Sequence, residues 1–171
     1  MLNVVTLFVP QGLALVHQHI YWRRGYALWV FMLAISTSMV SAQGEGGNAT
    51  LNPGFWPDPI VLRYYSGGNY DATSTYGESC VGRIASVPDH ILTVTEPLDY
   101  LRIYVESNAD TTLVVEQVST GEVACNDDAN DLNPGLEWDF VPIDIYHVYV
   151  GNYHENDALT EYQLFITEFE P

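Results

Sequence analysis

The sequence predicts an all-β domain, a sandwich or a barrel of about eight to nine short strands. Two observations support this fold class. After residue 54, short runs of β-branched and aromatic residues recur at intervals of roughly ten residues, and turn residues separate the runs. The same part of the chain shows no long segment with the apolar periodicity of an amphipathic helix. A helical bundle or a parallel α/β fold is therefore disfavoured.

Nine runs define the expected strands. In the clearest of them, residues 100–107, Leu101, Ile103 and Val105 alternate with polar or aromatic residues, so one face is expected to be buried. The run 145–151 alternates less cleanly but is rich in β-branched and aromatic residues, which favour strands. In chain order, the expected strands cover residues 60–65, 80–86, 90–95, 100–107, 112–118, 122–125, 136–140, 145–151 and 162–168.

The N-terminal part has the features of a secretory signal peptide, which we assign to residues 1–42. Arg23 and Arg24 precede an apolar run, residues 27–40, which is shorter than the ~20 residues of a membrane-spanning helix. Small residues at 40–42 provide a cleavage site, while an uncleaved anchor is the alternative. Residues 43–54 are rich in glycine and asparagine and predict a flexible leader, so that the domain covers residues 55–171. The protein is expected to be secreted or periplasmic.

The charge of the chain restricts the classes of partner. All 22 acidic residues lie after residue 42, together with only three arginines and no lysine. Such a surface repels nucleic acid and anionic membranes, so we expect neither as a partner once the signal peptide is cleaved. It is compatible with cation binding, or with solubility of a monomer outside the cell.

The two cysteines, Cys80 and Cys125, both lie in the part expected to be exported. In an oxidising compartment an even pair predicts a disulfide, which stabilises the fold by roughly 4 kcal/mol for a loop of this length. A metal pair or a catalytic thiol are the alternatives, but the spacing of the cysteines is not that of a zinc site.

An acidic segment, residues 126–131, is the strongest candidate for a metal site. Calcium takes six to eight oxygen ligands, and closely spaced Asp and Asn side chains on a turn-rich loop supply them. The alternative is ordinary turn chemistry, since Asn and Asp also stabilise turns through their own backbone. If calcium binds here, the expected ligands are Asp127, Asp128, Asn130 and Asp131.

A candidate binding face follows from the alternation in residues 100–107. If Leu101, Ile103 and Val105 point inward, Tyr100, Arg102 and Tyr104 share the outer face. Tyrosine and arginine are enriched at interfaces, and tyrosine rings stack on sugars or peptides. The alternative is that these residues only serve the strand, because tyrosine has a high β propensity and a polar tip.

Catalytic machinery is not evident in the sequence. Residues 43–171 contain neither a Gly-x-Ser-x-Gly elbow nor an acid–Ser–Gly nucleophile segment. Of the three histidines in this part, His147 and His154 are seven residues apart and lack a third ligand for zinc. His90 follows Pro88 and Asp89 at the start of an expected strand, where we expect a solvated turn residue.

Several motifs follow one another over residues 51–168. They are GFWPDP at 54–59, SGG at 66–68, CVGRIA at 80–85, DTTLVV at 110–115, CNDD at 125–128, LNP at 132–134, YHVYV at 146–150 and YQLFI at 162–166. Their order resembles the bacterial pre-peptidase C-terminal domain family, in particular its short, stand-alone secreted members. Asp144 departs from the family pattern, which has glycine there. The resemblance implies a jelly-roll-like antiparallel β-sandwich, a domain that larger secreted enzymes carry as an appended module.

These observations together predict a non-enzymatic secreted binding or accessory module with one disulfide and a candidate calcium site. Its ligand is an extracellular protein, a peptide or a carbohydrate. A small secreted serine peptidase is one alternative, because relatives of this type are sometimes labelled as peptidases. A purely structural surface protein is the other.

Overall fold

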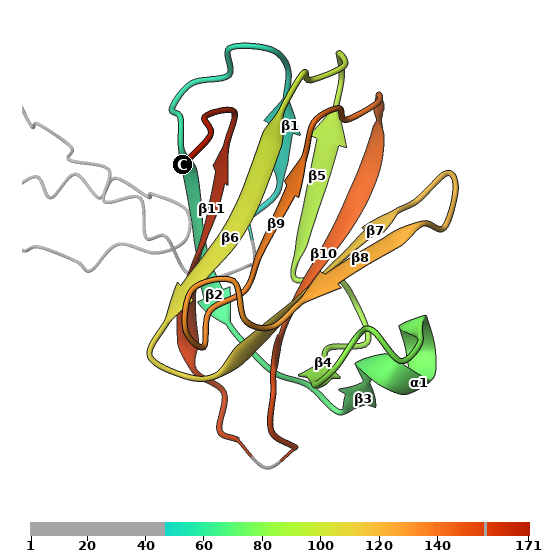
Figure 1. Cartoon of the computed structure of the whole chain (residues 1–171), viewed down its shortest axis with the longest axis vertical. Helices are drawn as coiled ribbons and strands as arrows, with labels where there is room; N and C mark the ends of the chain where they lie inside the picture. Colours follow the sequence, from blue (N-terminus) through green and yellow to red (C-terminus); the bar gives the residue numbers. More distant parts are fainter. Residues whose placement is uncertain (1–46, 156) are drawn as a thin grey trace, which may run out of the picture. The chain divides into compact units, whose positions relative to one another are not determined.

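The structure, a computed structural model, describes residues 47–155 and 157–171, which form a two-layered β-sandwich (Figure 1). The predicted signal peptide lies outside the described residues. The described residues contain eleven strands and one short helix. In chain order these are β1 Ala49–Leu51, β2 Ile60–Tyr65, β3 Tyr70–Asp71, α1 Ala72–Tyr76, β4 Arg83–Ile84, β5 His90–Val94, β6 Leu101–Ser107, β7 Thr111–Gln117, β8 Val123–Asn126, β9 Gly135–Trp138, β10 Asp144–Asn152 and β11 Glu161–Thr167.

The strands form two sheets. The smaller sheet has the order β2-β11-β6-β9 and is antiparallel throughout. The larger sheet is built on β10. One edge of β10 pairs with β7, and its other edge pairs first with β5 and then, at Asn152, with β4. Strand β8 extends this sheet beyond β7, and β1 extends it beyond β5. Only the β1–β5 pair is parallel among the described strands, so the prediction of an antiparallel β-sandwich is confirmed.

The main core lies between the two sheets. Strand β6 contributes Leu101, Ile103 and Val105, which are all buried, while the residues between them are partly exposed. Leu164 and Ile166 of β11 join them from the same sheet. The facing side chains come from the larger sheet and include Leu92, Val94, Leu113, Val115, Val148 and Val150. The alternation expected for residues 100–107 is thus confirmed, with the apolar face inward.

A second, smaller cluster lies on the other face of the larger sheet. Five consecutive residues of β7, Thr111 to Val115, are buried, because this strand is covered on both faces. Its outer neighbours come from the excursion between β2 and β5, which carries β3, α1 and β4. Buried members of the cluster are Ala72, Cys80, Ile84, Val114 and Tyr149.

The expectation of a flexible leader at residues 43–54 is wrong for its described part. Ala49 to Leu51 form β1 and pair in parallel with residues 92–94 of β5. Leu51 is fully buried in the main core, and Phe55 just beyond the expected boundary is buried as well. The apolar contact of Leu51 outweighs the turn-forming composition around it, since burying a leucine contributes about 2 kcal/mol.

The nine expected strands are all present, with ends shifted by a few residues. Residues 80–86 contain only the two-residue strand β4. The short elements β3 and α1 were not expected. Helix α1 begins after Asp71, whose side chain accepts a hydrogen bond from the Ser74 N–H at 3.3 Å, as an N-cap does. The described residues form no helix that could span a membrane.

Candidate functional site

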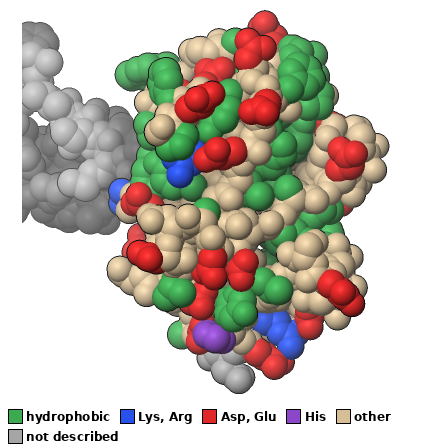
Figure 2. Space-filling model, in the orientation of Figure 1, with side chains coloured by type: hydrophobic (Ala, Val, Ile, Leu, Met, Phe, Trp, Pro, Cys, Tyr) green, Lys and Arg blue, Asp and Glu red, His purple; other side chains and the backbone are tan. Residues whose placement is uncertain are grey.

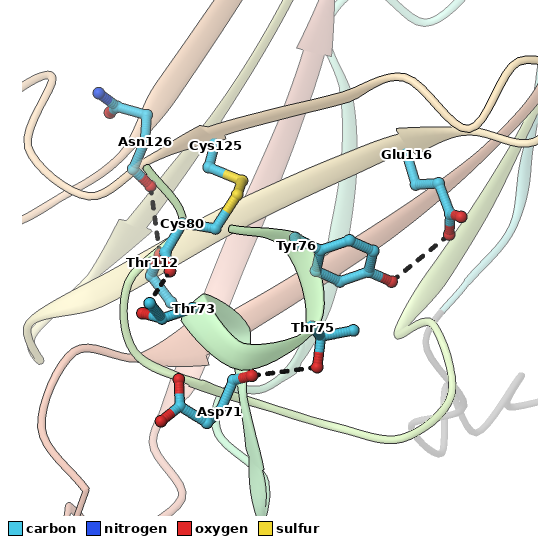
Figure 3. The surroundings of a disulfide bond; sticks show 9 residues. All are labelled: Asp71, Thr73, Thr75, Tyr76, Cys80, Thr112, Glu116, Cys125 and Asn126. Atoms are coloured by element: carbon cyan, nitrogen blue, oxygen red, sulfur yellow. Dashed lines mark hydrogen bonds between the residues drawn. A yellow bond between two sulfur atoms is a disulfide. The ribbon is translucent and has the colours of Figure 1, made fainter. Parts of the chain in front are cut away.

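The predicted disulfide is confirmed: Cys80 and Cys125 are bonded, with their Cα atoms 5.2 Å apart (Figure 3). The bond ties the excursion that carries α1 to β8 at the edge of the larger sheet. Around it, the Thr73 hydroxyl donates to the Cys80 carbonyl at 2.8 Å, and the Tyr76 hydroxyl donates to the Glu116 carboxylate at 3.4 Å. The cysteines therefore serve the fold, and neither is free to act as a nucleophile or a metal ligand.

The acidic segment forms a tight, internally bonded loop after β8. The Ala129 and Asn130 N–H groups both donate to the Asn133 carbonyl at 3.0 Å, and the Asn133 N–H donates back to Asn130. Asp131 adopts a positive φ of 53°, a conformation that Asp tolerates better than most residues. The side-chain oxygen of Asn126 accepts from the Gly135 N–H at 2.9 Å and closes the base of the loop. Turn chemistry thus accounts for much of the polar character of the loop.

The loop lies close to other acidic side chains. Burial raises the pKa of Asp110, and the nearby carboxylates of Asp128, Asp127 and Asp157 raise it further, while His154 lowers it. The His154 ring is 3.7 Å from the Asp110 carboxylate. Within residues 47–155 and 157–171, no three His, Cys, Asp or Glu side chains are arranged to hold a metal ion. The calcium site at Asp127, Asp128, Asn130 and Asp131 stays a prediction.

If turn chemistry alone accounts for the acidic segment, we expect the protein to melt at the same temperature in calcium, in magnesium and after chelation, at equal ionic strength. The reason is that the hydrogen bonds of the loop already hold it without an ion. Thermal unfolding followed by circular dichroism measures this directly. A rise specific to calcium, lost when Asp127 and Asp128 are both replaced by alanine, contradicts this expectation and establishes the predicted site.

The three residues of the predicted binding face do lie together on the outer face of the smaller sheet. The Arg102 guanidinium lies 4.7 Å from the centre of the Tyr104 ring, and its Nε is 3.1 Å from Glu137 of β9. Burial and the neighbouring Glu137 carboxylate raise the pKa of Tyr100. From the other neighbouring strand, β11, Phe165 stacks on Tyr104 with a centroid distance of 4.8 Å and nearly parallel rings.

The neighbours of Tyr104 restrict what can stack on the outer face. Phe165 reaches Tyr104 from β11, and Arg102 reaches it from the side of β9, so the faces of the Tyr104 ring are already occupied. A sugar ring would have to displace one of these neighbours before it could stack. The alternation in the sequence predicted that the three residues share a face. The stack could not be predicted in this way, because it depends on the pairing of Phe165 with Tyr104, which lie on strands far apart in the chain.

The three described histidines are all engaged with groups other than serine. His90 is fully buried, which corrects the expectation of a solvated turn residue. It is the first inward-facing residue of β5, and its ring contacts the Gly47 carbonyl at 2.8 Å and the Tyr162 hydroxyl at 2.7 Å. Burial lowers the pKa of His90. Since the carbonyl only accepts, Nδ1 carries the proton and Nε2 accepts from Tyr162.

The other two histidines pair with carboxylates. His147 lies 3.5 Å from Glu116, and His154 pairs with Asp110 as described above. Among the described residues, the hydroxyls of Ser66, Ser107 and Ser119 bond to Asn152, Glu161 and Asp144, and no serine hydroxyl bonds to a histidine. The described residues therefore do not assemble a serine–histidine pair.

An apolar cleft of about 500 Å³ lies between the two sheets, on the side where β8 and β9 are the edge strands. Leu101, Ile103 and Val115 of the core line it, and Trp138 and Phe140 lie at its rim. Figure 2 shows hydrophobic side chains gathered on this side, between β9 and the strands of the larger sheet. Phe140 is 59% exposed although it is large and apolar. We name this the inter-sheet cleft.

The inter-sheet cleft was not predicted from the sequence. Its lining comes from five strands and the two connections β7–β8 and β9–β10, and in the sequence each of its apolar residues has the pattern of core or of a strand. The available signal was the pair Trp138 and Phe140, two aromatic residues flanking an acidic one at the end of an expected strand. Residues two apart in a strand point to the same face, so this spacing predicts that both rings lie on one face of the chain.

Comparisons with known proteins give a distant structural similarity. No family model matches the sequence, and no curated protein matches it. Seven chains of known structure match, among them the pre-peptidase C-terminal domain of a collagenase from Bacillus anthracis. That chain is 15% identical, with a TM-score of 0.45, and the alignment covers 73% of this chain and 98% of the other. Membership of the family that the sequence resembles stays a prediction.

Proposed function

We propose that this protein is a non-enzymatic, extracytoplasmic binding module that holds an extended, basic peptide segment of another protein at the inter-sheet cleft. The observation that carries the proposal is the cleft itself. Its volume of about 500 Å³ lies in the range typical of ligand sites, and its lining is mainly apolar with a few polar groups. Large exposed apolar side chains such as Phe140 at a cleft rim favour a binding role.

The edges of the two sheets favour a peptide in extended form. Within the described residues, β8 pairs only with β7, and β9 pairs only with β6. On the free side of β9 the Gly135 N–H already donates to the Asn126 side chain, so an added strand would pair with the remaining backbone groups of β8 or β9, and its alternate side chains would enter the cleft. Peptide recognition by strand addition combines these two contributions, since the backbone gives affinity and the pocket gives specificity.

Charge favours a basic peptide. The chain has a net charge of −17 and contains no lysine. Glu122 lines the cleft and Asp139 lies between the two aromatic residues of its rim. A basic segment is attracted to this surface over about 10 Å at moderate salt, whereas an acidic one is repelled.

The remaining parts of the proposal have separate support. The engagement of all three described histidines with other groups supports a role without catalysis. The disulfide supports an oxidising, extracytoplasmic compartment, because such bonds are rare in reducing ones.

The test is fluorescence anisotropy with a short labelled peptide that alternates lysine and leucine. We expect binding that weakens with added salt, and no binding of the same peptide with glutamate in place of lysine. Phe140→Glu is expected to weaken binding at least ~10-fold, because it places a charge at the rim of the apolar cleft.

A matched control is available in the same connection between β9 and β10. Ile143 is 61% exposed, close to the 59% of Phe140, but it does not line the cleft. Ile143→Glu is therefore expected to bind the peptide like the wild type. Equal affinity of the wild type and Phe140→Glu, or equal loss in both variants, places the peptide elsewhere and refutes the proposal.

A further inference from the structure

A second hollow, away from the inter-sheet cleft, contains a buried carboxyl group. It has a volume of about 510 Å³ and lies beside the end of β2 and the chain that leads into β5. Its lining includes Tyr64, Tyr65, Val87 and Leu159, and it also includes Asp89, which is only 8% exposed. We name this the Asp89 hollow. The partners of the two Asp89 oxygens show how this carboxyl group is held there.

One oxygen of Asp89 has a structural partner. Strands β5 and β10 pair as far as His90 and Val148, and the Asp89 N–H still donates to the Val148 carbonyl at 2.9 Å. Pro88 then ends the pairing, because it has no N–H to donate. The Asp89 side chain replaces the missing strand: its Oδ2 accepts from the Val150 N–H at 2.8 Å. An asparagine or serine side chain provides the same acceptor without a buried charge.

The second oxygen, Oδ1, receives no hydrogen bond from the described residues. No arginine or histidine side chain of the described residues lines the hollow, and its titratable members besides Asp89 are Tyr64 and Tyr65. The adjacent His90 and Tyr162 are bonded to each other. Burial raises the pKa of Asp89 to about 7, since no cation compensates for the lost hydration.

We propose that the Asp89 hollow binds a primary ammonium group carried on an apolar body. The carboxylate supplies a charged acceptor at the floor, and the exposed apolar residues Val87 and Leu159 contact the body of the ligand. Tyr64 and Tyr65 line the same hollow and lie edge to face, and tyrosine rings attract cations through their negative faces. A neutral ligand of the same shape gains only the apolar contacts.

The probe is phenethylamine, compared with 2-phenylethanol, in isothermal titration calorimetry with the purified domain. We expect the amine to bind and the alcohol to bind at least ~10-fold more weakly, because a paired buried charge contributes more than a neutral hydrogen bond. Affinity for the amine is expected to fall ~100-fold from pH 8 to pH 5, as Asp89 takes up a proton that competes with the ligand.

The variant Asp89→Asn keeps an acceptor for the Val150 N–H and removes the charge. It is expected to bind amine and alcohol equally weakly at every pH. Asp99→Asn makes the same charge change at an exposed site outside the hollow and is expected to leave amine binding unchanged. The proposal is overturned if the amine does not bind, if the alcohol binds as tightly, or if Asp89→Asn retains the affinity of the wild type for the amine.

Discussion

Replacing Cys80 and Cys125 together by alanine is expected to lower the free energy of unfolding by about 4 kcal/mol. The bond closes a loop between positions 45 residues apart, and opening it returns that conformational freedom to the unfolded chain. Urea unfolding followed by tryptophan fluorescence measures the change, provided that the variant and the wild type have the same m-value. Reduced wild type should match the variant, which controls for the loss of the two sulfur atoms.

The structure also indicates which part of the protein loses stability first when the disulfide is removed. Cys80 belongs to the small outer cluster, whose other buried members are Ala72, Ile84, Val114 and Tyr149. The excursion with β3, α1 and β4 has few other buried contacts, because α1 has only five residues and one buried side chain. Hydrogen exchange is therefore expected to speed up in residues 70–84 before it does in β6 or β11. A change below about 1 kcal/mol in the unfolding free energy would mean that this cluster is stable without the disulfide.

Much of the fold could be predicted because its strands are long enough to show a period. Leu101, Ile103 and Val105 alternate in sequence for the same reason that they are buried in the structure: successive side chains of a strand point to opposite faces. The boundaries of β2 and β5 were close for a related reason, since turn residues mark both ends of each run.

The short elements could not be predicted in the same way. Strand β1 has three residues and helix α1 has five, which is too few for a period to emerge. Their stability comes from tertiary contacts, such as the burial of Leu51 in the main core and of Ala72 in the outer cluster. The glycine- and asparagine-rich composition around Leu51 pointed to a flexible leader, and it was overridden by these long-range contacts.

The same distinction applies to the candidate sites: those defined by local sequence could be predicted, and those that depend on long-range contacts could not. The cysteine pair followed from composition and compartment, and the trio Tyr100, Arg102 and Tyr104 followed from local alternation. The stack of Phe165 on Tyr104 depends on pairing between residues 61 positions apart in the chain, which local patterns do not encode. The inter-sheet cleft depends in addition on how the two sheets are placed, and so it required the structure.

Asp89→Asn is expected to make the protein more stable at pH 8, by up to about 4 kcal/mol, and to leave its stability near pH 4 almost unchanged. The pKa of Asp89 is about 7 in the folded protein, against an ordinary value of 3.8. Between these values the folded state binds a proton that the unfolded state has lost. Stability of the wild type should therefore fall as the pH rises from about 4 to 7, and stay low above 7.

Asparagine resembles the neutral carboxyl group and accepts the same hydrogen bond from the Val150 N–H. The stability of the variant therefore should not show the decrease between pH 4 and pH 7 that is expected of the wild type. Other acidic residues also titrate below pH 5, so the informative quantity is the difference in unfolding free energy between variant and wild type at each pH. Urea unfolding from pH 4 to pH 8 gives it, and Asp99→Asn should show no such difference, because Asp99 is exposed. Parallel curves for Asp89→Asn and the wild type would mean that Asp89 is ionised at little cost, and hence that its carboxylate is hydrated or paired in the folded protein.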